Sequence, residues 1–358
     1  MIEIREYNDI RDEELSSAWE SLTAAGLCPN LFMSYPWVAT WAEHLRAVVR
    51  PAVVVGYSQG GVVGIAPLFR GRDGSVGLPI SSNPMSLRGE LIVGEAHGPG
   101  FGSAVLEHFR RTRRPLRLRG VPRGSITFSC LMGRDSARGF IRHERAVREA
   151  PYIDIACTWE QYLAARPRKV VHEWERKIRR IERGGAVRVR RLGSEDSETL
   201  TREFIDVEGR SWKEERGSSI GQRGVSPFYT TVARLAAERG WFHPFWLELD
   251  GRTIAFLYGF VFGGAYWAIK TSYEEQSAGL APGVRLFHEA VGDAFRSGLS
   301  RFDFVGHRSR WTGEWATGWL EHVDIALYPR SPRGALAFAA ECWAAPALRR
   351  LTAAHRST

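Results

Sequence analysis

The feature that most limits the fold of this chain is a pair of similar hydrophobic units, one in each half of the sequence. Residues 52–69 read AVVVGYSQGGVVGIAPLF, and residues 245–262 read FWLELDGRTIAFLYGFVF. In both, two runs of β-branched and aromatic residues flank a short turn that contains glycine, which is typical of a β-hairpin. Because the two hairpins occupy corresponding places in the two halves, they indicate a duplicated domain.

The length of the chain and its breaks suggest where the domains lie. With 358 residues the chain exceeds one typical domain, and a junction falls near Ala150–Pro151. We therefore expect one domain over residues 1–150, a second over residues 151–330 and a helical tail over residues 331–358. Both domains combine strands with amphipathic helices, so the expected fold class is α/β.

Several classes of protein are excluded by the composition. The first residues, MIEIREYNDIRDEE, are charged and lack the apolar core of a signal peptide. No stretch approaches the roughly 20 apolar residues that a membrane-spanning helix needs. The 4 cysteines are scattered without a CxxC pair, so we expect neither a metal site nor a disulfide framework. These features favour a cytoplasmic protein without a metal.

The net charge of +9 is concentrated in two segments. Residues 166–191 hold eleven Lys or Arg against three Glu, a net of +8, and residues 110–123 hold seven Arg and no acid. Concentrated positive charge favours an anionic partner. The helix expected within 166–191 would ordinarily present a solvated basic face. Its alternative uses are contacts with a phosphate-bearing cofactor, a nucleotide sugar or the acceptor stem of a tRNA.

One loop in the second half suits a phosphate group. Residues 272–291, SYEEQSAGLAPGVRLFHEAV, read as a strand end, a loop of small residues and an amphipathic helix that begins at Pro282. The first N–H groups of a helix lack partners within it and lie at the positive end of its dipole. Gly283 permits close approach of an anion, and Arg285 adds a cation. The same residues are also typical of an ordinary helix start that binds no ligand. We expect this Pro-Gly helix start in the second half alone.

An ordered series of short motifs surrounds this loop and extends into the first half. The motifs are, in chain order, F-x-S-x-x-W-x-x-x-W (32–41), APLF (66–69), EGRSWKEE (208–215), AIKTSYEE (268–275), APGVRLFHEAV (281–291), FDFVG (302–306) and Trp315. With these motifs, the sequence resembles the GNAT acetyltransferase superfamily, and within it the CelD-like and Fem-type (FemAB-like) branch. The resemblance covers most of residues 30–320.

The resemblance implies a fold and a co-substrate. It implies two tandem GNAT-like domains, each a mixed, mostly antiparallel twisted sheet flanked by helices, and the first domain is not expected to bind cofactor. It also implies that the Pro-Gly helix start binds the pyrophosphate of acetyl-CoA or another acyl-CoA. The residues implied for this cofactor are Leu280, Pro282, Gly283, Val284 and Arg285.

One motif departs from the family. Many members carry Tyr-Lys before the last tryptophan, whereas this chain reads Trp311-Thr312-Gly313-Glu314-Trp315 and has no lysine there. Any role of that lysine in relatives is therefore in doubt here, and we expect a different contact with the acceptor or the donor.

Acyl transfer to an amine needs a deprotonated amine, donors for the developing oxyanion and a proton for the leaving thiolate. The strand edge from Lys270 to Tyr273 suits the oxyanion, and the Tyr273 phenol suits the proton. The alternatives are a solvated Lys270 and a Tyr273 that packs on the helix. The acceptor residues that we expect are Trp212, Lys213, Trp311 and Trp315, although core packing is the usual role of most of the 13 tryptophans.

The residues available as general base are Glu208, Glu214, Glu215, Asp303 and His307. Asp303 lies between two aromatic residues of a strand, so it points away from them, either into a cleft or to solvent. His307 follows the end of that strand and has the side chain best suited to neutral pH, although a single loop histidine is commonly incidental. Glu208 shares a helix face with Trp212. Deprotonation through water, without one essential base, is the remaining alternative.

Three functions follow from these observations. The first is an acyl-CoA-dependent N-acyltransferase that acts on a small amine or an amino sugar. The second, implied by the Fem-type relatives, is an aminoacyl-tRNA-dependent transferase, in which segments 110–123 and 166–191 would bind tRNA with strong salt dependence. The long helical arm of some Fem-type members is not evident. The third is a non-catalytic accessory protein of polysaccharide or natural-product biosynthesis.

Overall fold

The structure separates the chain into two compact units. The computed structural model describes residues 2–71, 74–77, 88–133, 138–192, 196–221 and 224–344. The first unit comprises Met1–Arg148 and Glu321–Thr358, and the second comprises Glu149–Leu320. Two long strands carry the chain from one unit to the other, β9 (Phe140–Asp154) and β15 (Gly318–Pro329). Of the expected tail 331–358, the part from 345 onwards lies outside the described residues.

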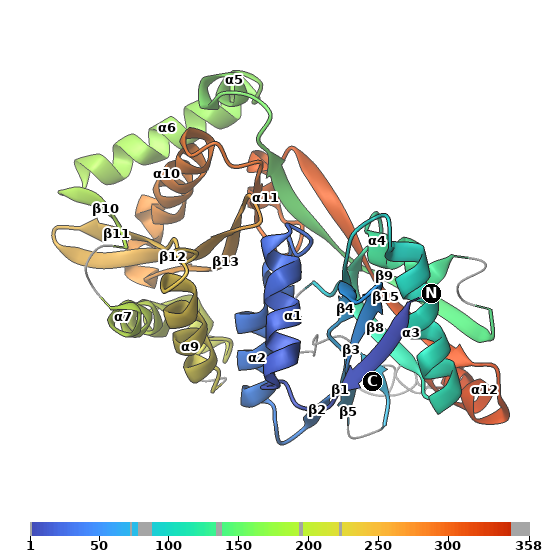
Figure 1. Ribbon diagram of the computed structural model, residues 1–358. Helices are drawn as coiled ribbons and strands as arrows, with labels where there is room; N and C mark the ends of the chain where they lie inside the picture. The colour runs from blue at the N-terminus through green and yellow to red at the C-terminus, as the bar shows by residue number, and fades with distance from the viewer. Residues whose placement is uncertain are drawn as a thin grey trace, which may run out of the picture. The chain divides into compact units, whose positions relative to one another are not determined.

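The first unit is built on mostly antiparallel strands, with β6 parallel to β8, and has helices against them (Figure 1). The expected hairpin at 52–69 is present as β3 and β4, which pair antiparallel from Val54↔Ala66 to Ser58↔Gly61. Strands β1-β3-β4-β7 form one sheet, and β15, β8, β6, β5 and β2 are neighbours in that order in another. The elements are β1 (Glu3–Tyr7), α1 (Glu13–Ala24), η1 (Leu31–Met33), α2 (Tyr35–His44), β2 (Val49–Pro51), β3 (Val53–Ser58), β4 (Gly61–Ala66), β5 (Phe69–Gly71), β6 (Val76–Gly77), β7 (Ile92–Val93), α3 (Gly98–Thr112), β8 (Leu116–Pro122), α4 (Ile126–Met132), α12 (Pro332–Ala339) and η3 (Ala340–Ala344).

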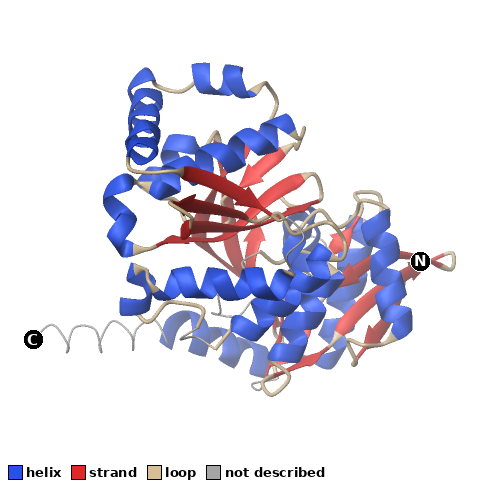
Figure 2. Cartoon of the chain, turned by 90° about the vertical axis from the view of Figure 1, so that its left-hand side faces the viewer, coloured by secondary structure: helices blue, strands red, loops and turns tan. Residues whose placement is uncertain are grey.

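The second unit has one sheet, in the order β10-β11-β12-β13-β14-β9, with helices on both faces (Figure 2). The expected hairpin at 245–262 is present as β11 and β12. Strand β14 runs parallel to β13, whereas β10 with β11, β11 with β12, β12 with β13 and β14 with β9 pair antiparallel. The elements are α5 (Trp159–Ala164), α6 (Arg168–Arg183), β10 (Val187–Arg191), α7 (Ser197–Gly209), α8 (Trp212–Glu215), α9 (Ser226–Ala237), β11 (Phe245–Leu249), β12 (Arg252–Phe262), β13 (Ala265–Tyr273), η2 (Glu275–Leu280), α10 (Pro282–Arg296), β14 (Arg301–Asp303) and α11 (Arg310–Trp315). The predicted fold class, mixed α/β with mostly antiparallel sheets flanked by helices, is confirmed.

The two faces of this sheet have different partners because strand side chains alternate. On one face, Leu257 and Ala255 of β12 join a core with Leu286 and Val291 of α10. On the other face, Tyr258 of β12 packs against the rings of α7 and α9. Helices α6 and α10 lie side by side on the first face (Figure 1).

A β-bulge in β13 decides which of its side chains meet α10. The register moves from Tyr258↔Lys270 to Gly259↔Ala268, which leaves Ile269 as the extra residue. Before the bulge, Tyr266 and Ala268 face the α10 core. After it, Tyr273 packs on the same core, so the alternation has moved by one residue. This change places the end of β13 beside the start of α10.

Candidate active site

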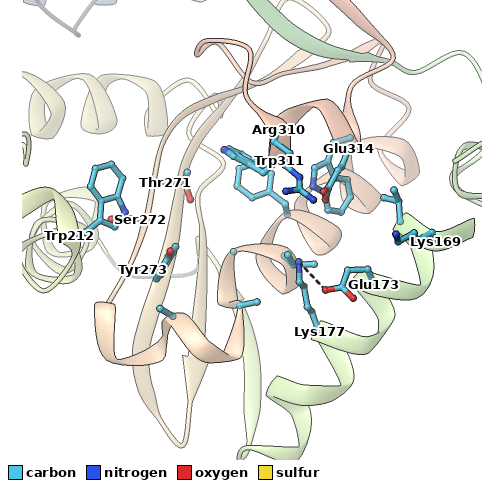
Figure 3. A pocket seen from close by; sticks show the side chains of 17 residues that line it. Lys169, Glu173, Lys177, Trp212, Thr271, Ser272, Tyr273, Arg310, Trp311 and Glu314 are labelled. Carbon is cyan, nitrogen blue, oxygen red and sulfur yellow. Dashed lines mark ion pairs between the residues drawn. The ribbon is translucent and has the colours of Figure 1, made fainter. Parts of the chain in front are cut away.

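A large cavity opens in the second unit where β13 ends and α10 begins. Its volume is about 1010 Å³. Figure 3 shows its walls, which come from α6, α11, the end of β13 and the start of α10. The described residues that line it are Lys169, Val170, Glu173, Lys177, Trp212, Thr271, Ser272, Tyr273, Ala278, Ala281, Gly283, Val284, Phe287, Arg310, Trp311, Glu314 and Trp315.

The first turn of α10 forms one wall and leaves its backbone accessible. Pro282 is the first helical residue, and Ala281 before it has φ 55° and ψ 51°, a left-handed conformation that turns the chain sharply into the helix. A Cβ added at Gly283 would meet no atom within 4 Å. The cavity therefore reaches the backbone at Gly283, next to the N–H groups of the helix start.

The first unit also has a Pro-Gly helix start, so our expectation that only the second half carries one is wrong. Helix α3 begins Gly98-Pro99-Gly100. There, a Cβ on Gly100, which corresponds to Gly283, would lie 3.2 Å from the side chain of Ile2, and one on Gly98 before the proline would lie 2.6 Å from the side chain of Ile126. The protein itself fills the space at this helix start, whereas the space at Gly283 is open. The sequence alone did not distinguish the two.

The end of β13 exposes a backbone edge beside this helix start. Strands β13 and β14 pair from Ala265↔Arg301 to Trp267↔Asp303, where β14 ends and β13 continues. Glu274 N–H donates to the carbonyl of Ile254 at 2.9 Å. Alternate residues of an antiparallel strand point to opposite edges, so the N–H groups of Thr271 and Tyr273 face away from β12, towards the side that β14 has left.

Helix α6 contributes a charged wall. Lys169, Glu173 and Lys177 are four residues apart and share one helix face that lines the cavity. Glu173 accepts a hydrogen bond from Arg176 at 2.7 Å and lies 3.4 Å from Lys177. The hydrogen bond from Arg176 is the main reason why the pKa of Glu173 falls to about 2. Glu173 therefore stays ionised near neutral pH and is poorly suited to accept a proton.

Tryptophans of α11 shape the wall next to α6. The Trp315 ring stacks on Trp174 of α6, with centroids 3.7 Å apart and planes at 9°. Both rings are buried, and the Tyr162 hydroxyl donates to the Trp315 carbonyl at 2.5 Å. Trp311 is 44% exposed and packs edge-on against Phe287. Trp315 thus ties α11 to α6, while Trp311 offers a free aromatic surface.

Two charged residues of α11 face the cavity without a protein partner. Arg310 and Glu314 are four residues apart and both line it (Figure 3). Among the residues that the structure describes, neither side chain has a hydrogen bond or an ion pair. Glu314 is half-buried. Since Glu173 is occupied by its cations, Glu314 is the lining carboxylate available to a ligand.

Only some of the catalytic candidates from the sequence lie at this cavity. Tyr273 lines it. The ammonium group of Lys270 instead lies 5.7 Å from the centroid of the Tyr229 ring, on the α9 face of the sheet. Asp303 is buried, and its carboxylate accepts from the N–H of Val305 at 2.8 Å. His307 is exposed and is not one of the described lining residues.

Glu208 and Lys213 form a buried ion pair behind the cavity wall. Lys213 Nζ lies 2.9 Å from Glu208 Oε1 and donates to the Thr271 carbonyl at 2.7 Å. The other oxygen of Glu208 accepts from Ile220 N–H at 2.7 Å. Both oxygens of Glu208 are therefore engaged. The pair holds the turn that carries Trp212, which does line the cavity.

Only some of the residues that the resemblance implied for the cofactor line the cavity. Gly283 and Val284 line the cavity, whereas Leu280 and Pro282 are not among its described lining residues. Arg285 points towards α6 and its own helix, because its guanidinium lies 3.1 Å from Glu289 and 3.7 Å from Glu182. Any contact of α10 with an anion therefore depends on the backbone near Gly283 rather than on the Arg285 side chain.

Sequence reasoning missed several lining residues. Lys169, Glu173 and Lys177 were recognised only as part of a basic helix, although their spacing marks one face. Glu314 lies within the motif that lacks the family lysine, yet nothing in the sequence gives its orientation. Phe287 has no local signal that places it at a site.

No helix in the described ranges is both long and apolar enough to cross a membrane. The same ranges contain no group of three or more His, Cys, Asp or Glu side chains arranged to hold a metal ion.

Comparison with known proteins identifies part of the chain. Residues 168–313, less than half of the chain, match the family model described as acetyltransferase (GNAT) domain, so this part is similar to such domains. No curated protein matches the sequence.

Solved structures share the fold along most of the chain. FemX is 12% identical, with a TM-score of 0.61 over 87% of this chain and 95% of that one. L-PGS from Bacillus licheniformis is 11% identical, with a TM-score of 0.59 over 92% and 94%. The C-terminal domain (DUF2156) of the protein named putative lysylphosphatidylglycerol synthetase from Agrobacterium fabrum is 11% identical, with a TM-score of 0.56 over 90% and 95%. At these identities, the likeness describes the fold alone.

Proposed function

We propose that this protein is an acyl-CoA-dependent N-acyltransferase that acts on a small amine or an amino sugar. One observation carries the proposal. The accessible helix start at Gly283 and the free backbone edge at Thr271 and Tyr273 line the same cavity. An acyl-CoA needs both, a site for its pyrophosphate and donors for its carbonyl oxygen.

The chain offers suitable groups for each part of acyl-CoA. The N–H groups of the first turn of α10 would bind the pyrophosphate, and Lys169 and Lys177 line the cavity for further phosphate contacts. Acyl-CoA supplies a thioester whose carbonyl carbon accepts the amine and whose thiolate leaves. The N–H groups of Thr271 and Tyr273 would stabilise the negative charge that develops on the carbonyl oxygen. The Tyr273 hydroxyl would return a proton to the thiolate.

The acceptor side of the cavity suits a cationic amine. The Glu314 carboxylate would bind the ammonium group, and its half-buried position strengthens the attraction by lowering the local dielectric constant. Trp212 and Trp311 would cover the carbon frame of the acceptor and attract its charge through their ring faces. Glu314 is also the lining group placed to accept the proton that the amine loses.

Ligand-dependent thermal stability tests this function. Acetyl-CoA at 100 times its dissociation constant should stabilise the protein by about 2.7 kcal/mol. Uncharged and charged tRNA should have smaller effects, and these should disappear as salt is raised. Stabilisation by charged tRNA without any response to acetyl-CoA or free coenzyme A would contradict the proposal.

A second function has one observation in its favour. Helix α6 presents cations on its surface beyond those that line the cavity, including the exposed Arg168, Arg179 and Arg183. A polyanion such as the acceptor stem of an aminoacyl-tRNA would suit this surface. The thermal experiment distinguishes this function from the first one.

Replacing Glu314 by Gln tests the acceptor assignment. We expect kcat/KM for amine acceptors to fall roughly tenfold or more, because a hydrogen bond to a charged group is lost. Release of free coenzyme A from acetyl-CoA, with tyramine and glucosamine as probes, measures the change. The dissociation constant of coenzyme A itself should not change.

Glu175→Gln is the matched control for this substitution. Glu175 is an exposed acid of α6 that pairs with Arg179 and is not one of the described residues lining the cavity. Equal losses in the two variants would contradict the role of Glu314.

A further inference from the structure

A buried carboxylate lies directly behind the cofactor loop. Glu274 follows Tyr273, the last residue of β13, and is 5% exposed. Its neighbour Glu275 has a similar sequence context but is exposed. Burial of one acid of the pair needs an explanation, since an uncompensated buried carboxylate is costly.

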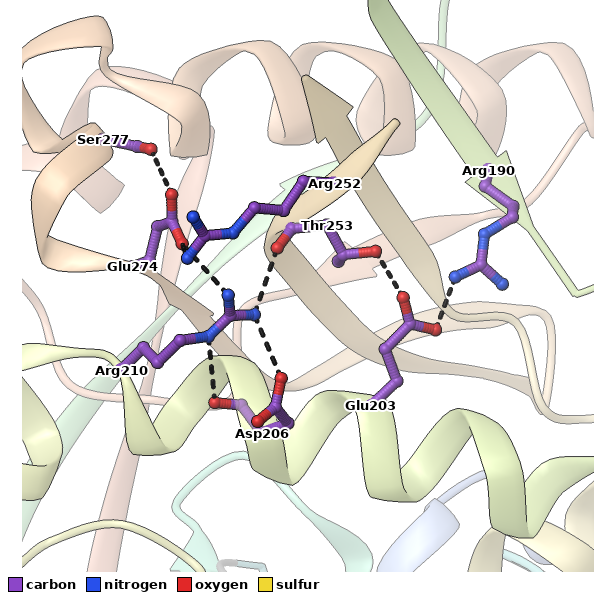
Figure 4. Close-up of polar contacts among 8 residues, drawn as sticks. All are labelled: Arg190, Glu203, Asp206, Arg210, Arg252, Thr253, Glu274 and Ser277. Atoms are coloured by element: carbon purple, nitrogen blue, oxygen red, sulfur yellow. Dashed lines mark hydrogen bonds and ion pairs between the residues drawn. The ribbon is translucent and has the colours of Figure 1, made fainter. Parts of the chain in front are cut away.

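The compensation comes from three separate elements (Figure 4). Arg252 of β12 donates to Glu274 Oε2 at 2.7 Å, and Arg210, at the end of α7, donates to the same oxygen at 3.3 Å. The Ser277 hydroxyl of η2 donates to Oε1 at 2.8 Å. Both carboxylate oxygens are thus used, and one side chain joins β12, the α7 terminus and the turn that leads to α10.

Backbone contacts place the same elements against each other. The N–H of Glu275 donates to the Arg210 carbonyl at 3.0 Å, and the N–H of Ser277 donates to the Glu274 carbonyl at 3.1 Å. Arg210 also lies 3.1 Å from Asp206 and donates to the Thr253 carbonyl. The turn after Arg210 carries Trp212 into the cavity, and the turn after Glu275 leads to Gly283.

We propose that Glu274 is a positioning residue that sets the geometry between the cofactor loop and the Trp212 wall of the cavity. It touches neither substrate nor donor. Through Ser277, its carboxylate holds η2 in the position that brings the start of α10 next to the end of β13. Through Arg210 it fixes the turn that presents Trp212. This inference rests on the acyl-CoA function proposed above.

Binding of free coenzyme A to the full chain tests the inference. We expect Glu274→Gln to raise the dissociation constant of coenzyme A about tenfold, because the loss of a residue that orients a binding group usually has an effect of at least this size. Glu275→Gln should leave it unchanged, because in the described structure the Glu275 side chain makes no hydrogen bond or ion pair. Calorimetry at 20 °C, with folded protein, gives both constants.

A second readout separates positioning from plain stability. Hydrogen exchange of the amides over residues 275–285 should become faster in Glu274→Gln, and not in Glu275→Gln. If Glu274→Gln does not fold, Ser277→Ala serves in its place, because it keeps both arginine contacts and removes only the link to η2. We expect it to raise the coenzyme A dissociation constant about threefold, less than the full loss of the network.

The outcomes are distinguishable from failure of the proposed function. A wild-type protein that does not bind coenzyme A overturns the function, and this inference with it. Wild-type binding combined with unchanged constants in Glu274→Gln and Ser277→Ala overturns the inference alone. A lower melting temperature in Glu274→Gln with unchanged binding and exchange also overturns it, since that result describes a stabilising residue only.

Discussion

Gly283→Val should weaken coenzyme A binding about 100-fold while the fold stays intact, because the new side chain would occupy the place of the pyrophosphate and remove two charge-assisted hydrogen bonds. The space at Gly283 is open, so no protein atom opposes the valine. Valine is also a better helix former than glycine. We expect the free energy of unfolding to change by no more than about 0.5 kcal/mol. Titration calorimetry and urea unfolding measure the two quantities.

Gly279→Val is the matched control. Gly279 belongs to the same loop, and a Cβ there would also meet no atom within 4 Å, but it is not one of the described residues lining the cavity. Coenzyme A should bind this variant as it binds the wild type. Unchanged binding in Gly283→Val would place the cofactor elsewhere.

Trp315→Ala should lower the free energy of unfolding by about 3–5 kcal/mol, the usual range for removing a buried tryptophan. The ring is 2% exposed and stacks on Trp174, so its loss leaves a void between α11 and α6. Since both helices line the cavity, acyl transfer should fall as well. Urea unfolding followed by circular dichroism gives the stability change.

Trp311→Ala provides the comparison on the same helix. Trp311 also lines the cavity but is 44% exposed, so its removal should cost only about 1 kcal/mol. Its effect should appear in the KM of the amine instead. If the two variants lose equal stability, the stacked pair does not join the two helices as described.

Local sequence was enough to predict the elements around the site. Pro282, Gly283 and the amphipathic pattern after them specify a helix start without help from distant residues, because capping and periodicity act within one turn. The two hairpins were predictable for the same reason. The alternation of side chains along a strand could not predict the position of Lys270, however. The bulge at Ile269 turns Lys270 to the other face of the sheet and brings Thr271 and Tyr273 to the cavity.

The cavity itself could not be assembled from the sequence. Lys169, Trp212, Tyr273 and Glu314 come from four elements that are far apart in the chain. Their meeting depends on how α6, α8, β13 and α11 pack, and packing is a property of the whole unit. Arg285 illustrates the limit on a smaller scale: it is adjacent to the right backbone, but helix phase directs it to Glu182 and Glu289.

The sequence by itself determined the α/β class, the two hairpins and a Pro-Gly helix start with the chemistry to bind an anion. Tertiary structure alone decided which of two such helix starts is open. At α3, the side chains of Ile2 and Ile126 lie close to Gly100 and Gly98, whereas at α10 the backbone of Gly283 faces a cavity. The physical reason is that N–H groups at a helix start follow from local backbone geometry, while their access to a ligand depends on which side chains from elsewhere pack against them.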